Sequence, residues 1–130
     1  MIAPGNLHMI LTRNGGTYEV GIKNGPRVHY QRPSVDVLFQ SVAKNAGRNA
    51  VGVMLTGMGA DGAKGMLAMK ACGAHTMAQD EATCVVYGMP KEAVKLGAVD
   101  DIVPLPKIPR AIVSVLEGDK NARKSLKKGD

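Results

Sequence analysis

The strongest indication of the fold is the sequence AVGVMLTGMGADG, residues 50–62. Its first half, residues 50–55, is an apolar run interrupted only by Gly52, a pattern typical of a parallel strand buried on both faces. Its second half, residues 56–62, contains three glycines and one carboxylate, Asp61. We therefore predict a central strand followed by a loop at its carboxyl end, where α/β folds place their ligands.

The pattern continues toward the carboxyl terminus as an alternation of helices and strands. We predict helices at 63–72, 92–96 and 108–116 and strands at 75–79 and 102–103, with a polar turn at 80–83. Strand, helix, strand, helix, strand in this order predicts a mostly parallel sheet with right-handed crossovers. The predicted fold class is α/β, with helices on both faces of the sheet.

The segment before this stretch predicts a β-hairpin and one helix. Residues 8–12 and 17–23 are rich in branched side chains, and the Asn-Gly-Gly turn between them allows the positive φ angles of a tight hairpin. After a loop at 24–33, apolar residues recur at helical spacing from Val35 to Ala46. Ser34 is the predicted N-cap of this helix, and Gly47 is the predicted stop.

Composition excludes several classes of protein. The chain has 130 residues, is 45% apolar and carries a net charge of +6, which suits a globular domain. The charge is +4 over residues 1–50, −2 over 51–106 and +4 over 107–130. With four aromatic residues in all, a nucleic-acid partner is not predicted. No apolar window is long enough for membrane insertion, and no signal peptide is recognisable, so we expect a cytoplasmic location.

Cysteine and histidine spacing predicts no metal site and no cofactor. Cys72 and Cys84 are expected to be buried, reduced thiols. His8, His29 and His75 are each expected to be surface or hydrogen-bonded histidines, although His8 could line a cleft. Most of the eight methionines are expected to fill the core.

One interpretation of the loop is a dinucleotide site. Gly57, Gly59 and Gly62 match the spacing G-x-G-x-x-G between a strand and a helix, and Asp80 follows at about 20 residues. Against it, the carboxylate of Asp61 lies inside the loop and would repel a diphosphate. This interpretation remains the less favoured one.

The other interpretation gives Asp61 a role in acyl transfer. A buried aspartate can orient a histidine and stabilise its imidazolium form, and N–H groups of a glycine-rich turn can bind an oxyanion. The structural alternative is that Asp61 only caps the helix that begins at Ala63. Composition alone favours the cap.

Four blocks of sequence resemble the bacterial chemotaxis protein-glutamate methylesterases, in the same order and with similar spacing over about residues 1–116. They are Ile2 to Gly5 with His8, Arg32 to Phe39, Leu55 to Ala63, and Ala78 to Pro90. Members of this family have an α/β catalytic domain, hydrolyse glutamate methyl esters on chemoreceptor helices, and deamidate certain receptor glutamines. Their site is a Ser-His-Asp triad without a cofactor. The resemblance implies that Asp61 is the triad aspartate and that Gly57, Met58 and Gly59 form the oxyanion loop.

The resemblance also shows what the 130 residues do not contain. The family's serine lies in a Ser-Thr-Gly-Gly type turn and its histidine in a Gln-His-Met-Pro type segment, and neither motif occurs here. We therefore expect residues 1–116 to be the C-terminal portion of a methylesterase catalytic domain, inactive alone, followed by a basic and flexible tail at 117–130. The implied partners are methylated chemoreceptor helices and a histidine kinase that acts on a receiver domain absent from this sequence. The alternative is an inactive module that binds receptor or partner.

Overall fold

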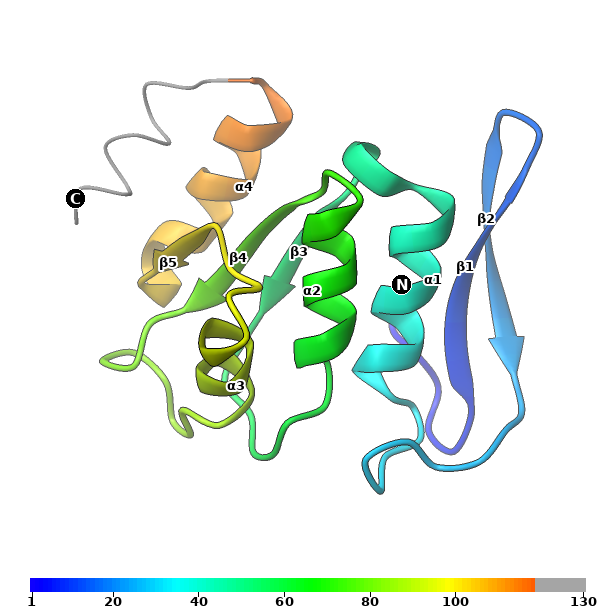
Figure 1. Ribbon diagram of the computed structural model, residues 1–130, viewed down its shortest axis with the longest axis horizontal. Helices are drawn as coiled ribbons and strands as arrows, with labels where there is room; N and C mark the ends of the chain where they lie inside the picture. The colour runs from blue at the N-terminus through cyan, green and yellow to red at the C-terminus, as the bar shows by residue number, and fades with distance from the viewer. Residues whose placement is uncertain (119–130) are drawn as a thin grey trace.

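The computed structural model describes residues 1–118, and Figure 1 shows two parts that lie side by side. A β-hairpin stands beside helix α1, and a three-stranded sheet with three helices forms the rest. The elements in chain order are β1 (His8–Asn14), β2 (Thr17–Lys23), α1 (Val35–Asn45), β3 (Val51–Met54), α2 (Ala63–Ala71), β4 (His75–Gln79), α3 (Met89–Lys95), β5 (Asp101–Val103) and α4 (Ile108–Leu116). The expected flexible tail falls largely at 119–130, outside the described residues.

The hairpin forms as predicted. Strands β1 and β2 pair antiparallel from His8 opposite Lys23 to Asn14 opposite Thr17. The outer edge of β1 is fixed to α1, because the Leu11 N–H donates to Ser41 Oγ at 2.8 Å. The first residues of β1 therefore lie at the same end of the molecule as the first turn of α1.

Helix α1 packs closely against α2, and a glycine makes this possible. Ser34 is the N-cap, as predicted, and its hydroxyl accepts from the Val37 N–H at 3.4 Å. A Cβ added at Gly65 of α2 would lie 2.6 Å from the Cβ of Phe39. The two helix backbones can approach to this extent because Gly65 has no side chain.

The sheet is parallel, with strand order β3-β4-β5 and helices on both of its faces. On one face, α2 and α3 cover a cluster built around Met54 and Met66. On the other, α4 covers a cluster built around Met77 and Val103. The α/β prediction is confirmed, as is the role of these methionines as core residues.

The prediction of the central strand is wrong within the described residues. Strand β3 pairs only with β4 and is half-buried at Val51 and Val53, whereas every residue of β4 is buried. Strand β4 carries polar side chains, which are not typical of a central strand. These side chains form hydrogen bonds within the protein. Thr76 Oγ1, for example, donates to the Ala98 carbonyl at 2.6 Å, so its burial leaves no unpaired donor.

The prediction of two buried thiols is also wrong. Cys72 is exposed and Cys84 is half-buried, and both are free. Cys72 is the C-cap of α2, and a helix end faces solvent more readily than the helix face that packs on the sheet. Within residues 1–118, no helix combines the length and apolar character needed to cross a membrane.

Candidate functional site

The loop after β3 is held rigidly by the segment 86–89. The Gly57 N–H donates to the Val86 carbonyl at 3.1 Å, and the Gly57 carbonyl accepts from the Met89 N–H at 2.8 Å. At the start of the loop, the Thr56 N–H donates to Gln79 Oε1 at 2.8 Å. A Cβ at Gly57 would lie 2.5 Å from the Met89 sulfur, so any other residue there would require the Met89 side chain to move. The loop is therefore an anchored part of the sheet's carboxyl edge.

Asp61, near the end of this loop, is buried with 5% of its surface exposed. Its Oδ1 accepts from Ser34 Oγ at 2.7 Å and from the Asp36 N–H at 3.1 Å, and its Oδ2 accepts from the Val35 N–H at 2.7 Å. Asp61 thus caps α1 from a distant part of the chain, with its negative charge at the positive end of the helix. A carboxylate offers about four lone-pair sites. Three of the four accept hydrogen bonds, so one lone pair on Oδ2 has no donor among residues 1–118.

The prediction that Asp61 caps the helix that begins at Ala63 is wrong, because Asp61 caps α1 instead. Helix α2 has Gly62 at its N-cap position, and no side chain caps it. Gly62 has φ +96°, and this left-handed conformation turns the chain immediately before α2 begins. A Cβ there would meet Val35 at 2.7 Å, so the turn also brings the loop into contact with the start of α1.

A buried histidine, His8, is linked to Asp61 through Ser34 and has hydrogen-bond partners on both ring nitrogens. His8 is 2% exposed; its Nδ1 accepts from the Ser34 N–H at 3.1 Å, and its Nε2 donates to the Pro26 carbonyl at 2.8 Å. Because Nδ1 is an acceptor in this network, the ring is neutral with its proton on Nε2. His8 therefore positions the N-cap of α1, and the expectation of a hydrogen-bonded histidine is confirmed.

A second acid lies beside Asp61 and is not evident from the sequence. Asp36 is buried, its Oδ1 accepts from the Gly65 N–H at 2.7 Å, and its Oδ2 pairs with His29 Nε2 at 2.7 Å. One ligand atom from each of His29, Asp36 and Asp61 fits within 4.8 Å, so these three could hold a metal ion. The only sequence signal was an acid in the first turn of a helix, which is also a common helix-stabilising feature.

The remaining loop residues expose backbone donors. The Met58 side chain is 81% exposed, and Gly59 has φ +95°. Among residues 1–118, no acceptor pairs with the N–H of Met58 or of Gly59. Such donors at the edge of a sheet can bind a developing oxyanion. The structure thus brings Met58 and Gly59 into the same loop as Asp61, while Gly57 serves as its anchor.

The thiol beside this loop is a poor nucleophile. Burial raises the pKa of Cys84, and the charges of Asp80 and Glu81 raise it further, against a hydrogen bond with Thr56 that lowers it. The thiolate is the nucleophilic form of cysteine, so a raised pKa reduces reactivity at neutral pH. Burial likewise raises the pKa of Tyr87.

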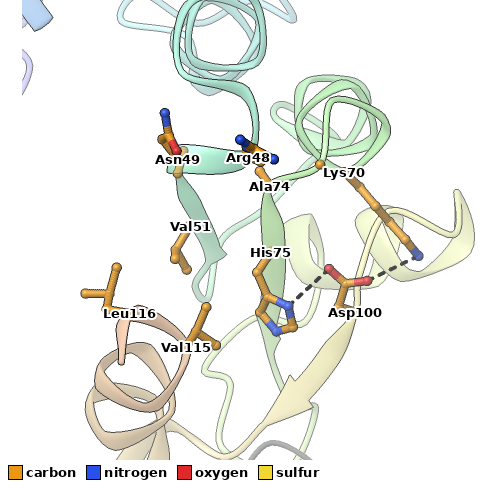
Figure 2. Close-up of a pocket in the computed structure, with 11 residues that line it drawn as sticks. Arg48, Asn49, Val51, Lys70, Ala74, His75, Asp100, Val115 and Leu116 are labelled. Carbon is orange, nitrogen blue, oxygen red and sulfur yellow. Dashed lines mark ion pairs between the residues drawn. The ribbon is translucent and has the colours of Figure 1, made fainter. Parts of the chain in front are cut away.

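A pocket of about 620 Å³ lies at the opposite end of the sheet, where the strands begin. Figure 2 shows His75 and Lys70 directed toward Asp100 from β4 and α2. His75 Nδ1 lies 3.5 Å and Lys70 Nζ 3.8 Å from the Asp100 carboxylate, and His75 Nε2 pairs with Asp101. The expectation that His75 is satisfied is confirmed. The group joins the amino ends of β4 and β5 and does not contact the Asp61 loop.

Comparison with known proteins agrees with this geometry. The family model for CheB methylesterase matches residues 1–112. Protein-glutamate methylesterase/protein-glutamine glutaminase 2 of Syntrophus aciditrophicus is 66% identical over 116 residues, which are 89% of this chain and 34% of that protein. The corresponding enzyme of Shigella flexneri is 55% identical over 122 residues, 94% of this chain and 35% of its own length. The chain thus spans about a third of the length of these curated relatives.

A solved structure supports the same assignment. The crystal structure of the Thermotoga maritima CheB methylesterase catalytic domain superposes with a TM-score of 0.83 at 34% sequence identity. The match covers 86% of this chain and 59% of that one. The resemblance found in the four sequence blocks is confirmed, and the chain belongs to the CheB methylesterase family.

Proposed function

We propose that this chain supplies the aspartate and the oxyanion loop of a protein-glutamate methylesterase that also acts as a protein-glutamine glutaminase. The observation that carries the proposal is the state of Asp61. Its carboxylate is buried and held by three hydrogen bonds, yet one lone pair on Oδ2 remains open within the described residues. This is what an orienting acid requires, namely a fixed position and capacity for one more donor.

The proposed chemistry is hydrolysis of a glutamate methyl ester by a serine, histidine and aspartate. Asp61 would accept the N–H of the histidine, which selects its tautomer and stabilises the imidazolium that forms when the serine loses its proton. The exposed N–H groups of Met58 and Gly59 would bind the oxyanion of the tetrahedral intermediate. Collapse of the intermediate releases methanol from an ester or ammonia from a glutamine amide, and water then frees the glutamate.

The serine and the histidine are not assigned to residues of this chain. The Ser34 hydroxyl donates a hydrogen bond to Asp61, and both ring nitrogens of His8 form hydrogen bonds. Neither is arranged as a nucleophile with its base. We therefore expect turnover only when a polypeptide that carries the family's serine and histidine motifs completes the site.

The test is methanol release from a methylated chemoreceptor cytoplasmic fragment. The chain is assayed alone and after co-refolding with a polypeptide that carries the serine and histidine motifs. We expect release only in the mixture, and a loss of about 10⁴-fold with Asp61→Asn, the scale for a misoriented triad histidine. Urea unfolding of the variant separates a folding defect from a chemical one. Full activity with a folded Asp61→Asn chain would contradict the proposal, as would release by the chain alone at the rate of the mixture.

The partners and the location belong to the same proposal. The substrates are methylated cytoplasmic helices of chemoreceptors, and the regulator is a histidine kinase that phosphorylates a receiver domain outside this sequence. The site of action is the cytoplasm. The names of the relatives support the enzyme class. Co-purification of the completed enzyme with receptor fragments, compared before and after methylation, tests the substrate.

A further inference from the structure

A groove of about 770 Å³ runs between the hairpin and α1 and reaches the candidate site. One end is formed by His29 and Asp36, whose side chains offer atoms within 4.8 Å of the Asp61 carboxylate. From there it follows α1 to Lys44 in the last turn. Eleven helical residues span about 16 Å, so the groove is about as long as three turns of helix.

The walls of the groove are basic at both of its ends. Arg13 and Lys44 lie at the far end, and Lys23 and Lys64 lie at the end near Asp61. In the part of the chain that the structure describes, the ammonium groups of the three lysines form no ion pair or hydrogen bond. They are exposed and available to a partner.

Among the described residues that line the groove, the only acid is Asp36, and its single negative charge does not cancel the four positive ones. Asp36 is buried, and each of its oxygens has one partner, the Gly65 N–H for Oδ1 and His29 Nε2 for Oδ2. The floor contains half-exposed apolar side chains, among them Ile10, Val28 and Val37. Basic walls over an apolar floor favour a partner with an apolar stripe flanked by carboxylates.

We propose that this groove binds an acidic amphipathic helix of the substrate protein and thereby presents a neighbouring ester to the Asp61 site. The inference rests on the proposed function, because it assigns the substrate's flanking segment to the groove. Each hydrolysed ester leaves a glutamate carboxylate. The groove therefore holds de-esterified segments more tightly than esterified ones, and their charge guides the enzyme along a helix with several sites.

The test measures binding and needs no catalysis. A fluorescent 14-residue helical peptide with glutamates beside a leucine stripe is titrated with the 130-residue chain at 50 mM salt, next to the same peptide with every glutamate replaced by glutamine. We expect the glutamate peptide to bind at least tenfold more tightly. The difference should fall to about twofold or less at 500 mM salt, because the Debye length shortens as salt is added.

The decisive variant is Lys23→Glu with Lys44→Glu, which reverses the charge at the two ends of the groove. We expect it to weaken binding of the glutamate peptide about tenfold. The matched control is Lys91→Glu with Arg110→Glu, which changes the net charge equally on exposed positions of α3 and α4. We expect the control to change affinity by no more than twofold. Circular dichroism verifies that both variants are folded.

In the binding assay, three results would overturn the inference: equal affinity for the two peptides, equal losses in the groove and control variants, or tighter binding of a polyphosphate or DNA oligonucleotide than of the peptide. The outcomes also separate this inference from the proposed function. Peptide binding without methanol release in the completed enzyme contradicts the function alone. Methanol release with a KM unchanged by the groove variant contradicts the groove alone.

Discussion

Asp61 is expected to matter for stability as well as for chemistry, and Asp61→Ala separates the two roles. The change removes the acceptor of three hydrogen bonds at the first turn of α1, two from backbone N–H groups and one from Ser34. These donors lie in a buried site, where loss of a hydrogen-bond partner lowers the free energy of unfolding more than it does at the surface. The loss of activity expected of a triad aspartate should therefore be accompanied by a clear loss of folding stability.

The magnitude follows from the three bonds. A hydrogen bond to a charged group contributes about 1.5–3 kcal/mol, and loss of an N-cap about 0.5–2 kcal/mol. Water entering the vacated space and rotation of the Ser34 hydroxyl recover part of the cost. We expect Asp61→Ala to lower the free energy of unfolding by about 4 kcal/mol, a large share of the ~5–15 kcal/mol typical of a domain.

The assay is urea unfolding followed by circular dichroism at 222 nm. With an m-value of about 2 kcal/mol/M, the midpoint should fall by about 2 M. The control is Asp80→Ala, which removes the same side chain from a half-buried local turn where it accepts from Thr83. We expect the control to cost about 1 kcal/mol. A loss for Asp61→Ala no greater than that of Asp80→Ala would refute the assignment of Asp61 as the cap of α1.

Three further predictions concern the packing and chemistry of other residues. Gly62→Ala should lower the free energy of unfolding by about 3 kcal/mol, since a Cβ there meets side-chain carbons at 2.6 and 2.7 Å and φ is +96°. The control Gly5→Ala, where a Cβ would enter open space, should change the urea midpoint little. Met77→Ala, at a fully buried position in β4, should cost about 2–5 kcal/mol in the same assay. Iodoacetamide at pH 8 should alkylate the exposed Cys72 well before Cys84, whose pKa is raised by burial, and peptide mapping that finds Cys84 modified first would contradict this.

Most of the secondary structure could be predicted because its signals are local. The hairpin turn, the Ser34 cap and the strand 75–79 depend on residues a few positions apart, and the structure has them where the sequence placed them. The final helix, Ile108–Leu116, also matches its predicted bounds. The position of a strand within the sheet is not a local property, so the polar sequence of β4 does not indicate that this strand is the middle one of the three.

The candidate site likewise combines features that are local in the sequence with contacts between distant segments. The family, the glycine loop and the acid at position 61 can be identified from the sequence alone, because glycine spacing and residue identity are properties of the chain itself. That this acid caps α1 follows from the tertiary structure, since its hydrogen-bond partners lie at positions 34–36, about 25 residues earlier. The tertiary structure also decided that His29 and Asp36 lie beside Asp61 and that four basic residues from separate elements line one groove. Contacts between distant segments depend on how helices and strands pack, and no short pattern in the sequence encodes them.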